Sequence, residues 1–380
     1  MLQGAERLEG LKEYYFSRKL KEIQSLRDSG HDVINLGIGS PDLPPHHSVI
    51  EAISISAAKP ENHGYRAYNG SPDLRESIVR WLKRVYDLSE ISPSHILPLM
   101  GSKEGILHVN LAFANPNDEV LVPELGYPAY RSIGEMLGLK VKTYPLNDKF
   151  HPNFKWLEEN GGNAKILWCN YPHMPTGTAA TNEIFDQLID FGNRHQVLIA
   201  HDNPYSLVLN NNPLSLLSRP GALDIAIELN SLSKSHHMAG WRIGWAAGNE
   251  VYIERILKIK SNIDSGMFRG IEESAIAALS LTDSYHQSIN QQYKERQTNA
   301  FELLKSLNCQ FDPNQTGMFV WGKLPEGYLA EDFCEKILKD NHIFITPGSL
   351  FGESGKSYIR VSLCVTTDRI YEANERIKNG

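Results

Sequence analysis

The chain has 380 residues, 41% of them hydrophobic and 22% charged, and its 38 Lys and Arg against 45 Asp and Glu give a formal net charge of −7. This length exceeds the usual size of one hydrophobic core, so we expect two domains. The acidic balance, without a basic tail, argues against a nucleic-acid or anionic-membrane partner. No apolar stretch approaches the roughly 18 residues of a membrane span, and the N-terminus lacks a leader-like apolar segment, which favours a cytoplasmic location.

The pattern of expected helices and strands differs between two parts of the chain. From about residue 75 to 275, short apolar runs alternate with helical patterns, which predicts an α/β fold with a mostly parallel sheet of seven strands. These strands are expected at residues 96–99, 120–122, 140–144, 165–169, 197–200, 226–229 and 243–246. We take residues 46–275 as a large domain.

Beyond residue 275 the pattern predicts a smaller α+β domain. A long helix is expected at 285–307 and a shorter one near 330–338, with strands at 318–321, 343–345 and 358–362. Residues 1–45 are expected to pack beside these elements, so the small domain would comprise residues 1–45 and 276–380.

The four cysteines, Cys169, Cys309, Cys334 and Cys364, are scattered without the spacing of a redox pair or a metal site. We therefore expect reduced core thiols and no metal.

Polar residues follow several expected strands, at the sheet edge where open α/β sheets bind ligands. Gly101, Ser102 and Lys103 open a helical pattern after strand 96–99, and free backbone N–H groups at a helix start suit a phosphate. The same residues would also make an ordinary helix cap. Asp202 and Tyr205 follow strand 197–200, where an aspartate is more often a simple loop cap.

A lysine with several polar neighbours follows strand 226–229. Ser231, Ser233 and Lys234 come first, and Arg242 lies eight residues after the lysine. Two hydroxyls, an amine and a guanidinium could bind one phosphate and one carbonyl, although a lone lysine here could equally be a surface residue.

Taken together, these segments resemble the class I/II aminotransferases, which belong to fold-type I of the enzymes that use pyridoxal 5′-phosphate (PLP). Eight segments match in the family's order and span nearly the whole chain: 35–42 (NLGIGSPD), 64–70 (GYRAYNG), 101–104 (GSKE), 123–130 (PELGYPAY), 170–177 (NYPHMPTG), 202–205 (DNPY), 231–244 (SLSKSHHMAGWRIG) and 358–362 (YIRVS). The segments 101–105 (GSKEG) and 261–266 (SNIDSG) are most similar to the subgroup of LL-diaminopimelate, alanine and methionine aminotransferases.

The resemblance implies a homodimeric enzyme that moves an amino group between an L-amino acid and a 2-oxo acid. Lys234 would hold PLP as a Schiff base and carry the proton between the substrate Cα and the cofactor C4′. Asp202 would pair with the protonated ring nitrogen, Tyr205 would donate to the phenolic oxygen and Tyr127 would stack on the ring. These roles make Lys234, Asp202 and Tyr205 the expected catalytic residues.

The resemblance also implies how the cofactor and the substrate are bound. Tyr65 would reach the phosphate of the partner subunit, with Tyr68 as a weaker alternative, and Arg360 would bind the substrate carboxylate beside the backbone of Ile38 and Gly39. The remaining cofactor-binding residues would be Gly101, Ser102, Lys103, Asn170, Ser231, Ser233 and Arg242.

Two features depart from the family pattern. Met174 stands where the family has an asparagine that donates to the phenolic oxygen of PLP, and a thioether cannot donate. Tyr205 would then hold that oxygen alone unless His173, Asn170 or a water replaces the missing donor. His236 and His237, next to Lys234, are also unusual.

The sequence leaves two questions open. A PLP-dependent lyase or decarboxylase on the same scaffold is the alternative activity, whereas a PLP-binding transcription regulator is disfavoured because no DNA-binding domain precedes the match. The amino donor is not determined, because no second arginine can be assigned to a distal carboxylate.

Overall fold

The fold is built on a seven-stranded sheet, and the computed structural model describes residues 2–8 and 15–379 of the chain. The strand order is β2-β8-β7-β6-β5-β3-β4. Strand β8 is antiparallel to its neighbours β2 and β7, and the other pairs are parallel. The strands are β2 (Ile96–Leu99), β3 (Glu119–Pro123), β4 (Lys140–Tyr144), β5 (Ile166–Asn170), β6 (Leu198–Asp202), β7 (Ala226–Ser231) and β8 (Gly244–Gly248).

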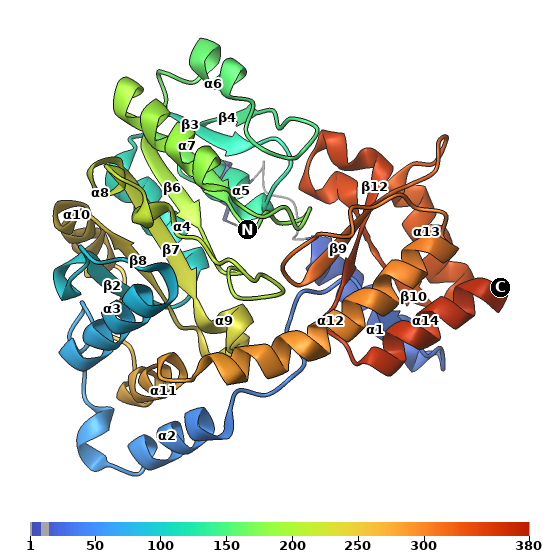
Figure 1. Cartoon of the computed structure of the whole chain (residues 1–380), viewed down its shortest axis with the longest axis horizontal. Helices are drawn as coiled ribbons and strands as arrows, with labels where there is room; N and C mark the ends of the chain where they lie inside the picture. The colour runs from blue at the N-terminus through green and yellow to red at the C-terminus, as the bar shows by residue number, and fades with distance from the viewer. Residues whose placement is uncertain (1, 9–14, 380) are drawn as a thin grey trace.

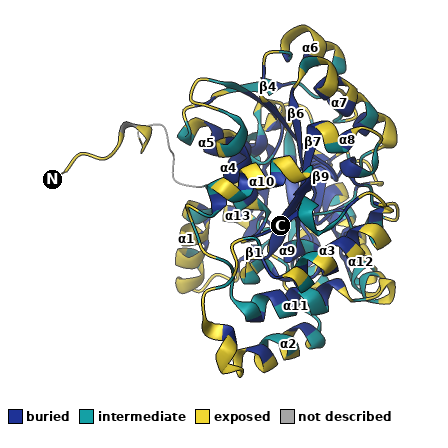
Figure 2. Ribbon diagram, turned by 90° about the vertical axis from the view of Figure 1, so that its left-hand side faces the viewer, coloured by how far each residue is buried: buried dark blue, intermediate teal, exposed yellow. Residues whose placement is uncertain are grey.

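Helices cover both faces of this sheet, which explains why its central strands are buried along their whole length. One face packs against α3 (Pro72–Tyr86), α7 (Asn182–His195) and α11 (Arg269–Leu279). The other face packs against α4 (Ser102–Phe113), α5 (Pro128–Met136) and α10 (Glu250–Lys260). Figure 2 shows buried strands behind helices whose outer faces are exposed.

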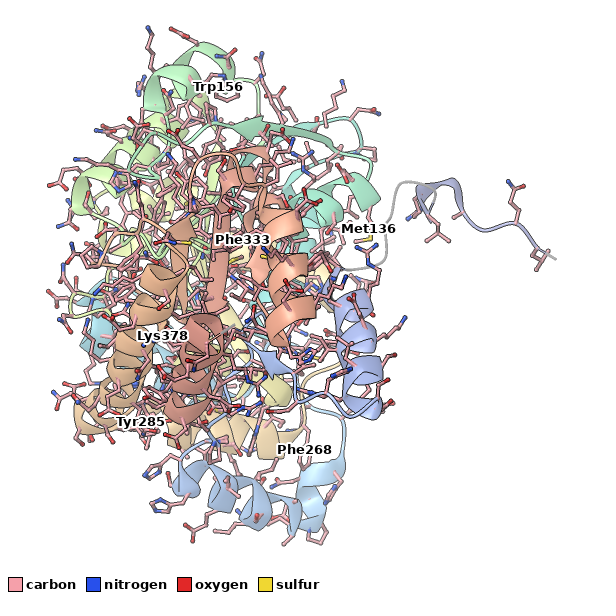
Figure 3. The ribbon with its side chains drawn as sticks, turned by 90° about the vertical axis from the view of Figure 1, so that its right-hand side faces the viewer. Met136, Trp156, Phe268, Tyr285, Phe333 and Lys378 are labelled. Carbon is pink, nitrogen blue, oxygen red and sulfur yellow. The ribbon has the colours of Figure 1, made fainter. Side chains whose placement is uncertain are left out.

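A second, antiparallel sheet of order β11-β12-β9 lies beside the first one (Figure 1). It is built from β9 (Phe319–Lys323), β11 (Thr346–Pro347) and β12 (Tyr358–Ser362), with α12 (Asp283–Ser306), α13 (Ala330–Asn341) and α14 (Thr367–Asn379) around it. Near the N-terminus, α1 (Tyr15–Asp28) precedes β1 (Ile34–Asn35), which pairs in parallel with β10 (Ile343–Phe344). In Figure 3, Phe333 of α13 and Lys378 of α14 lie on the side that faces the viewer.

Short elements complete the chain. They are the helices α2 (His47–Ala57), α6 (Phe154–Asn160), α8 (Ala222–Ile225) and α9 (Leu232–Ser235), and the 3-10 turns η1 (Glu6–Leu8), η2 (Pro60–His63), η3 (Pro93–His95), η4 (Leu216–Ser218), η5 (Ala239–Trp241), η6 (Gly348–Phe351) and η7 (Glu353–Ser357).

The prediction of an α/β fold with a mostly parallel seven-stranded sheet is confirmed. The strand expected at 343–345 is present as β10 (Ile343–Phe344), which pairs with β1. A further short strand, Thr346–Pro347, is not among the expected strands; it follows directly and pairs with β12. All four cysteines are free and buried. Within residues 2–8 and 15–379, no helix is long and apolar enough to cross a membrane, and no group of three or more His, Cys, Asp or Glu side chains could hold a metal ion.

Candidate active site

A cavity of about 730 Å³ lies where the parallel strands end, and the small sheet closes its other side. Asn170, Asp202 and Ser231 are the last residues of β5, β6 and β7, and the register places Asn170 beside Asp202. Because β8 is antiparallel to both β2 and β7, β2 also ends at this edge and leads there into α4. The topology therefore brings together residues that lie far apart in the chain.

Most of the predicted site residues line this cavity. They are Ile38, Gly39, Ser102, Lys103, Tyr127, Asn170, Asp202, Tyr205, Ser231, Ser233, Lys234, Arg242 and Arg360.

Lys234 lies on the single-turn helix α9, directly after β7. Its Nζ donates a hydrogen bond of 2.6 Å to the carbonyl of Gly39. Burial lowers the pKa of Lys234, and the nearby positive charges of Arg360 and Arg242 act in the same direction. A lower pKa increases the fraction of neutral amine, the form that attacks a carbonyl.

Asp202 presents a carboxylate oxygen that the protein leaves unsatisfied. Oδ2 accepts a hydrogen bond of 2.8 Å from the hydroxyl of Tyr130, whereas the buried Oδ1 has no hydrogen-bond partner among the described residues. Burial raises the pKa of Asp202 to about 6, against the opposing effect of Tyr130. A buried carboxylate with one open oxygen suits a cationic N–H donor.

A buried polar network lies behind Asp202. His201 Nδ1 is 2.8 Å from Glu228 Oε2, which also accepts hydrogen bonds of 2.9 Å from the Ser215 hydroxyl and the Leu216 N–H. Burial alone would raise the pKa of Glu228, but the hydrogen bonds from His201 and its other neighbours outweigh it and lower the pKa. The network satisfies this buried charge, which fixes the end of β6.

The start of α4 contributes to the cavity lining groups that can bind an anion. Gly101 precedes the helix with φ +87° and, as a glycine, has no side chain with which to cap it. A Cβ added to Gly101 would lie 2.4 Å from Arg242 Nη2, so both the backbone angle and the close approach require glycine. Arg242 donates to the carbonyls of Ala239 and Met100, at 2.9 and 3.2 Å. Free N–H groups beside a guanidinium suit a phosphate.

Arg360 lies at the opposite end, on β12. Its guanidinium carbon is 3.9 Å from the ring centre of Phe319 and 4.6 Å from that of Phe351. Nη2 donates a hydrogen bond of 2.7 Å to the Gly37 carbonyl, and Nη1 lies 3.4 Å from Met174 Sδ. The aromatic rings hold the planar fork in one orientation, as bidentate carboxylate binding requires.

Of the two protein side chains proposed as substitutes for the missing asparagine, His173 is engaged through both ring nitrogens and Asn170 through its oxygen and one N–H. His173 Nε2 lies 3.1 Å from the Leu125 carbonyl, and Nδ1 lies 2.8 Å from the Thr176 hydroxyl. Asn170 donates to the Asp202 carbonyl at 2.5 Å and accepts from the Met174 N–H at 2.8 Å. His173 therefore faces away from the cavity lining, and Asn170 is held by backbone groups.

Some expected site residues lie elsewhere. Tyr65 lies away from the described cavity lining and is 95% exposed, and Tyr68 is 47% exposed. His236 and His237 face away from the cavity: His236 contacts Ser235 and His286, and His237 Nε2 is 3.3 Å from the Tyr293 hydroxyl.

Sequence reasoning missed three residues of the site. Tyr130 donates a hydrogen bond to Asp202, and the rings of Phe319 and Phe351 pack against the guanidinium of Arg360. Tyr130 belongs to the matched segment 123–130, so the motif contained a signal, whereas nothing in the sequence pairs either phenylalanine with Arg360.

The cavity fits PLP at three points. The open Asp202 oxygen suits the protonated ring nitrogen, the Lys234 amine suits the aldehyde, and the start of α4 with Arg242 suits the phosphate.

Comparisons with known proteins agree with this assignment. The family described as aminotransferase class I and II matches residues 31–377. The LL-diaminopimelate aminotransferase of Aquifex aeolicus is 38% identical, covering 100% of this chain and 99% of its own length. The LL-diaminopimelate aminotransferase of Maridesulfovibrio salexigens is 40% identical, covering 98% of each chain.

Solved structures are similar over the same range. Substrate-bound BacF from Bacillus subtilis superposes with a TM-score of 0.95 at 30% identity, covering 100% of this chain and 98% of its own. A probable N-succinyldiaminopimelate aminotransferase from Thermus thermophilus has a TM-score of 0.90 at 31% identity, covering 96% of this chain and 99% of its own. The chain therefore belongs to the class I and II aminotransferases, enzymes that depend on pyridoxal 5′-phosphate.

Proposed function

We propose that Lys234, Asp202 and Tyr205 carry the chemistry of amino-group transfer in this cavity. The observation that carries the proposal is the buried Asp202 oxygen, which has no partner in the described protein and lines the same cavity as Lys234. When bound, PLP withdraws electrons from the substrate Cα and so stabilises the charge left when the Cα proton is removed. The Lys234 amine would take that proton from the substrate Cα and deliver it to C4′ of the cofactor.

The residues around these three hold the cofactor in place. Asp202 keeps the ring nitrogen protonated, Tyr205 donates to the phenolic oxygen and Tyr127 packs on the ring. The phosphate is bound by Gly101, Ser102, Lys103, Ser231, Ser233 and Arg242, and Asn170 fixes the Asp202 backbone.

Arg360 binds the substrate carboxylate, with the backbone of Ile38 and Gly39 on the same side. Support comes from the aromatic enclosure of its guanidinium, which leaves the planar fork in a fixed orientation within the cavity lining. Arg360→Lys keeps the charge but loses the fork, so we expect KM for the amino donor to rise by roughly tenfold or more, the effect of losing one charge-assisted hydrogen bond.

The chain acts as a homodimer in which Tyr65 reaches the partner's phosphate site. Supporting this, Tyr65 is a large aromatic side chain that is 95% exposed, and its neighbour Arg66 pairs with Gly266 in an antiparallel bridge. A fixed backbone beneath an exposed ring suits a protein partner.

We also propose that residues 46–275 form the cofactor-binding domain and residues 1–45 with 276–380 the small domain; residues 1, 9–14 and 380 of that division lie outside the described residues. The pairing of β1 with β10 supports it. A cytoplasmic location belongs to the same proposal and is supported by four free cysteines.

LL-diaminopimelate is the first amino donor to test, because the two sequence relatives reported above are named for it. The purified enzyme is mixed with LL-diaminopimelate, alanine or methionine and 2-oxoglutarate, and both the cofactor absorption and the products are followed. We expect glutamate and the oxo acid of the donor in equal amounts. Release of CO2 or free ammonia without glutamate would instead identify the lyase or decarboxylase alternative.

A further inference from the structure

A second group of charged side chains lies next to the phosphate end of the cavity and has no part in the proposed reaction. Glu104 is in the first turn of α4, Lys260 is the last residue of α10, and Asp264 follows one turn later. Lys260 Nζ lies 2.6 Å from both oxygens of Asp264 and 3.5 Å from Glu104 Oε1, although Lys260 is only 2% exposed. The group joins the segments 101–105 and 261–266, which are far apart in the sequence.

Glu104 is connected to the phosphate site through one residue. The N–H of Met100 donates to Glu104 Oε2, and the carbonyl of Met100 accepts from Arg242 Nη2 at 3.2 Å. Gly101 follows Met100, and because a Cβ there would lie 2.4 Å from Arg242 Nη2, the glycine leaves room for the guanidinium. Glu104 and Arg242 therefore hold the two polar groups of the residue that leads into α4.

The charge balance of Glu104, Lys260 and Asp264 favours the protonated form of the Glu104 carboxyl. The positive charge of Lys260 is balanced by Asp264, so an ionised Glu104 would be an additional buried negative charge. Burial raises the pKa of Glu104 to about 7 and Asp264 acts in the same direction, whereas Lys260 and the hydrogen bond from the Met100 N–H oppose it. The other titratable group facing Glu104 among the described residues is His108, whose Nε2 is 3.6 Å from Glu104 Oε1; burial lowers the pKa of His108, which keeps it neutral near pH 7.

We propose that Glu104 is a positioning residue for the phosphate site, and that its carboxyl group must carry a proton for the phosphate to bind tightly. The inference rests on the proposed function, in which the start of α4 and Arg242 bind the phosphate of PLP. A phosphate dianion at the start of α4 adds negative charge close to Glu104, which stabilises the protonated carboxyl. By linkage, phosphate affinity is full below the pKa of Glu104 and falls as the pH rises through it.

The test compares the binding of two ligands to the apoenzyme, which is prepared by removing the cofactor from the purified holoenzyme. PLP and pyridoxal, which lacks the phosphate, are titrated at pH values of about 7.0 and 8.5, where a phosphate monoester, with a second pKa of about 6, is already a dianion. Three proteins are used: the unaltered chain, Glu104→Gln and the matched control Glu135→Gln. Glu135 is an exposed residue of α5 whose carboxylate faces Arg131. The ratio of the two ligands' affinities isolates the phosphate contribution, because both carry the same ring and aldehyde.

In the unaltered chain and in Glu135→Gln, we expect the preference for PLP over pyridoxal to fall about tenfold from the lower to the higher pH, as ionisation of one linked group predicts. Glu104→Gln keeps the acceptor for Met100 but cannot ionise, so its preference should stay constant and exceed that of the unaltered chain about tenfold at the higher pH. The same pH dependence in Glu104→Gln and in the unaltered chain would overturn the inference.

A second variant covers the case in which Glu104→Gln does not fold. Asp264→Asn removes the neighbouring negative charge, so Glu104 should ionise at lower pH and the preference for PLP should already be reduced at the lower of the two pH values. An unchanged preference would contradict the inference. Failure of the proposed function looks different, because the unaltered chain would then bind PLP no better than pyridoxal at either pH, which overturns both.

Discussion

Met174→Asn tests how the protein holds the phenolic oxygen of PLP. In the structure, Met174 Sδ lies 3.4 Å from Arg360 Nη1, inside the cavity lining. Asparagine at this position would offer its carbonyl to Arg360 and an N–H₂ donor to the cavity, which a thioether lacks. Both nitrogens of His173 contact other groups and His173 is not part of the cavity lining, so it does not supply that donor in the unaltered chain.

The new donor should lower the pH at which the absorption of the bound cofactor changes. A hydrogen bond to a charged oxygen is worth about 1.5–3 kcal/mol. The oxygen carries more negative charge in the unprotonated form of the cofactor linkage than in the protonated form, so the donor stabilises the unprotonated form more. If roughly half of the hydrogen-bond energy distinguishes the two forms, the pKa of the colour change falls by about one unit, at about 1.36 kcal/mol per unit.

The assay is a spectral pH titration of the purified holoenzyme. Met174→Leu is the matched control, because it removes the sulfur without adding a donor and should leave the transition within a few tenths of a pH unit of the unaltered chain. A transition in Met174→Asn at the same or higher pH would refute the reasoning and would mean that Asn170, Tyr205 or a water already satisfies the oxygen.

Three further predictions concern the cofactor site. The holoenzyme should be yellow and should become covalently labelled on borohydride reduction at Lys234, whereas Lys234→Ala should take up no label; label on another lysine in peptide mapping would contradict the assignment. Equal mixing of Tyr65→Phe and Lys234→Ala subunits should give about a quarter of the sites intact by random pairing, so activity should reappear after subunit exchange, and a fully active monomer in dilute solution would disprove the shared site. Gly101→Ala should weaken PLP affinity by roughly tenfold or more, because the new Cβ would lie 2.4 Å from Arg242, while Gly138→Ala, also at positive φ but with its nearest contact at 3.8 Å, should bind PLP normally in the same titration.

Much of the fold could be predicted from the sequence because its signals are local. The central strands β5, β6 and β7 of the large sheet are short apolar runs buried on both faces, and such runs stand out between helical patterns without any knowledge of their partners. The change of partner after β10 could not be predicted in this way. Ile343–Phe344 pairs with β1 and Thr346–Pro347 pairs with β12, and these partners come from opposite ends of the chain.

The same distinction between local and long-range signals applies to the candidate site. The sequence by itself determined the chemical groups, because the carboxylate of Asp202, the amine of Lys234 and the guanidinium of Arg360 are given by the residue types at these positions. Only the tertiary structure decided the hydrogen bonding and the orientation of each group. The hydroxyl of Tyr130, from α5, occupies one carboxylate oxygen of Asp202 and leaves the other open. The orientation of Arg360 depends on two phenylalanines from separate elements. The physical reason is that burial, hydrogen-bond satisfaction and ring stacking act between residues that packing alone brings together, whereas residue identity is already fixed along the chain.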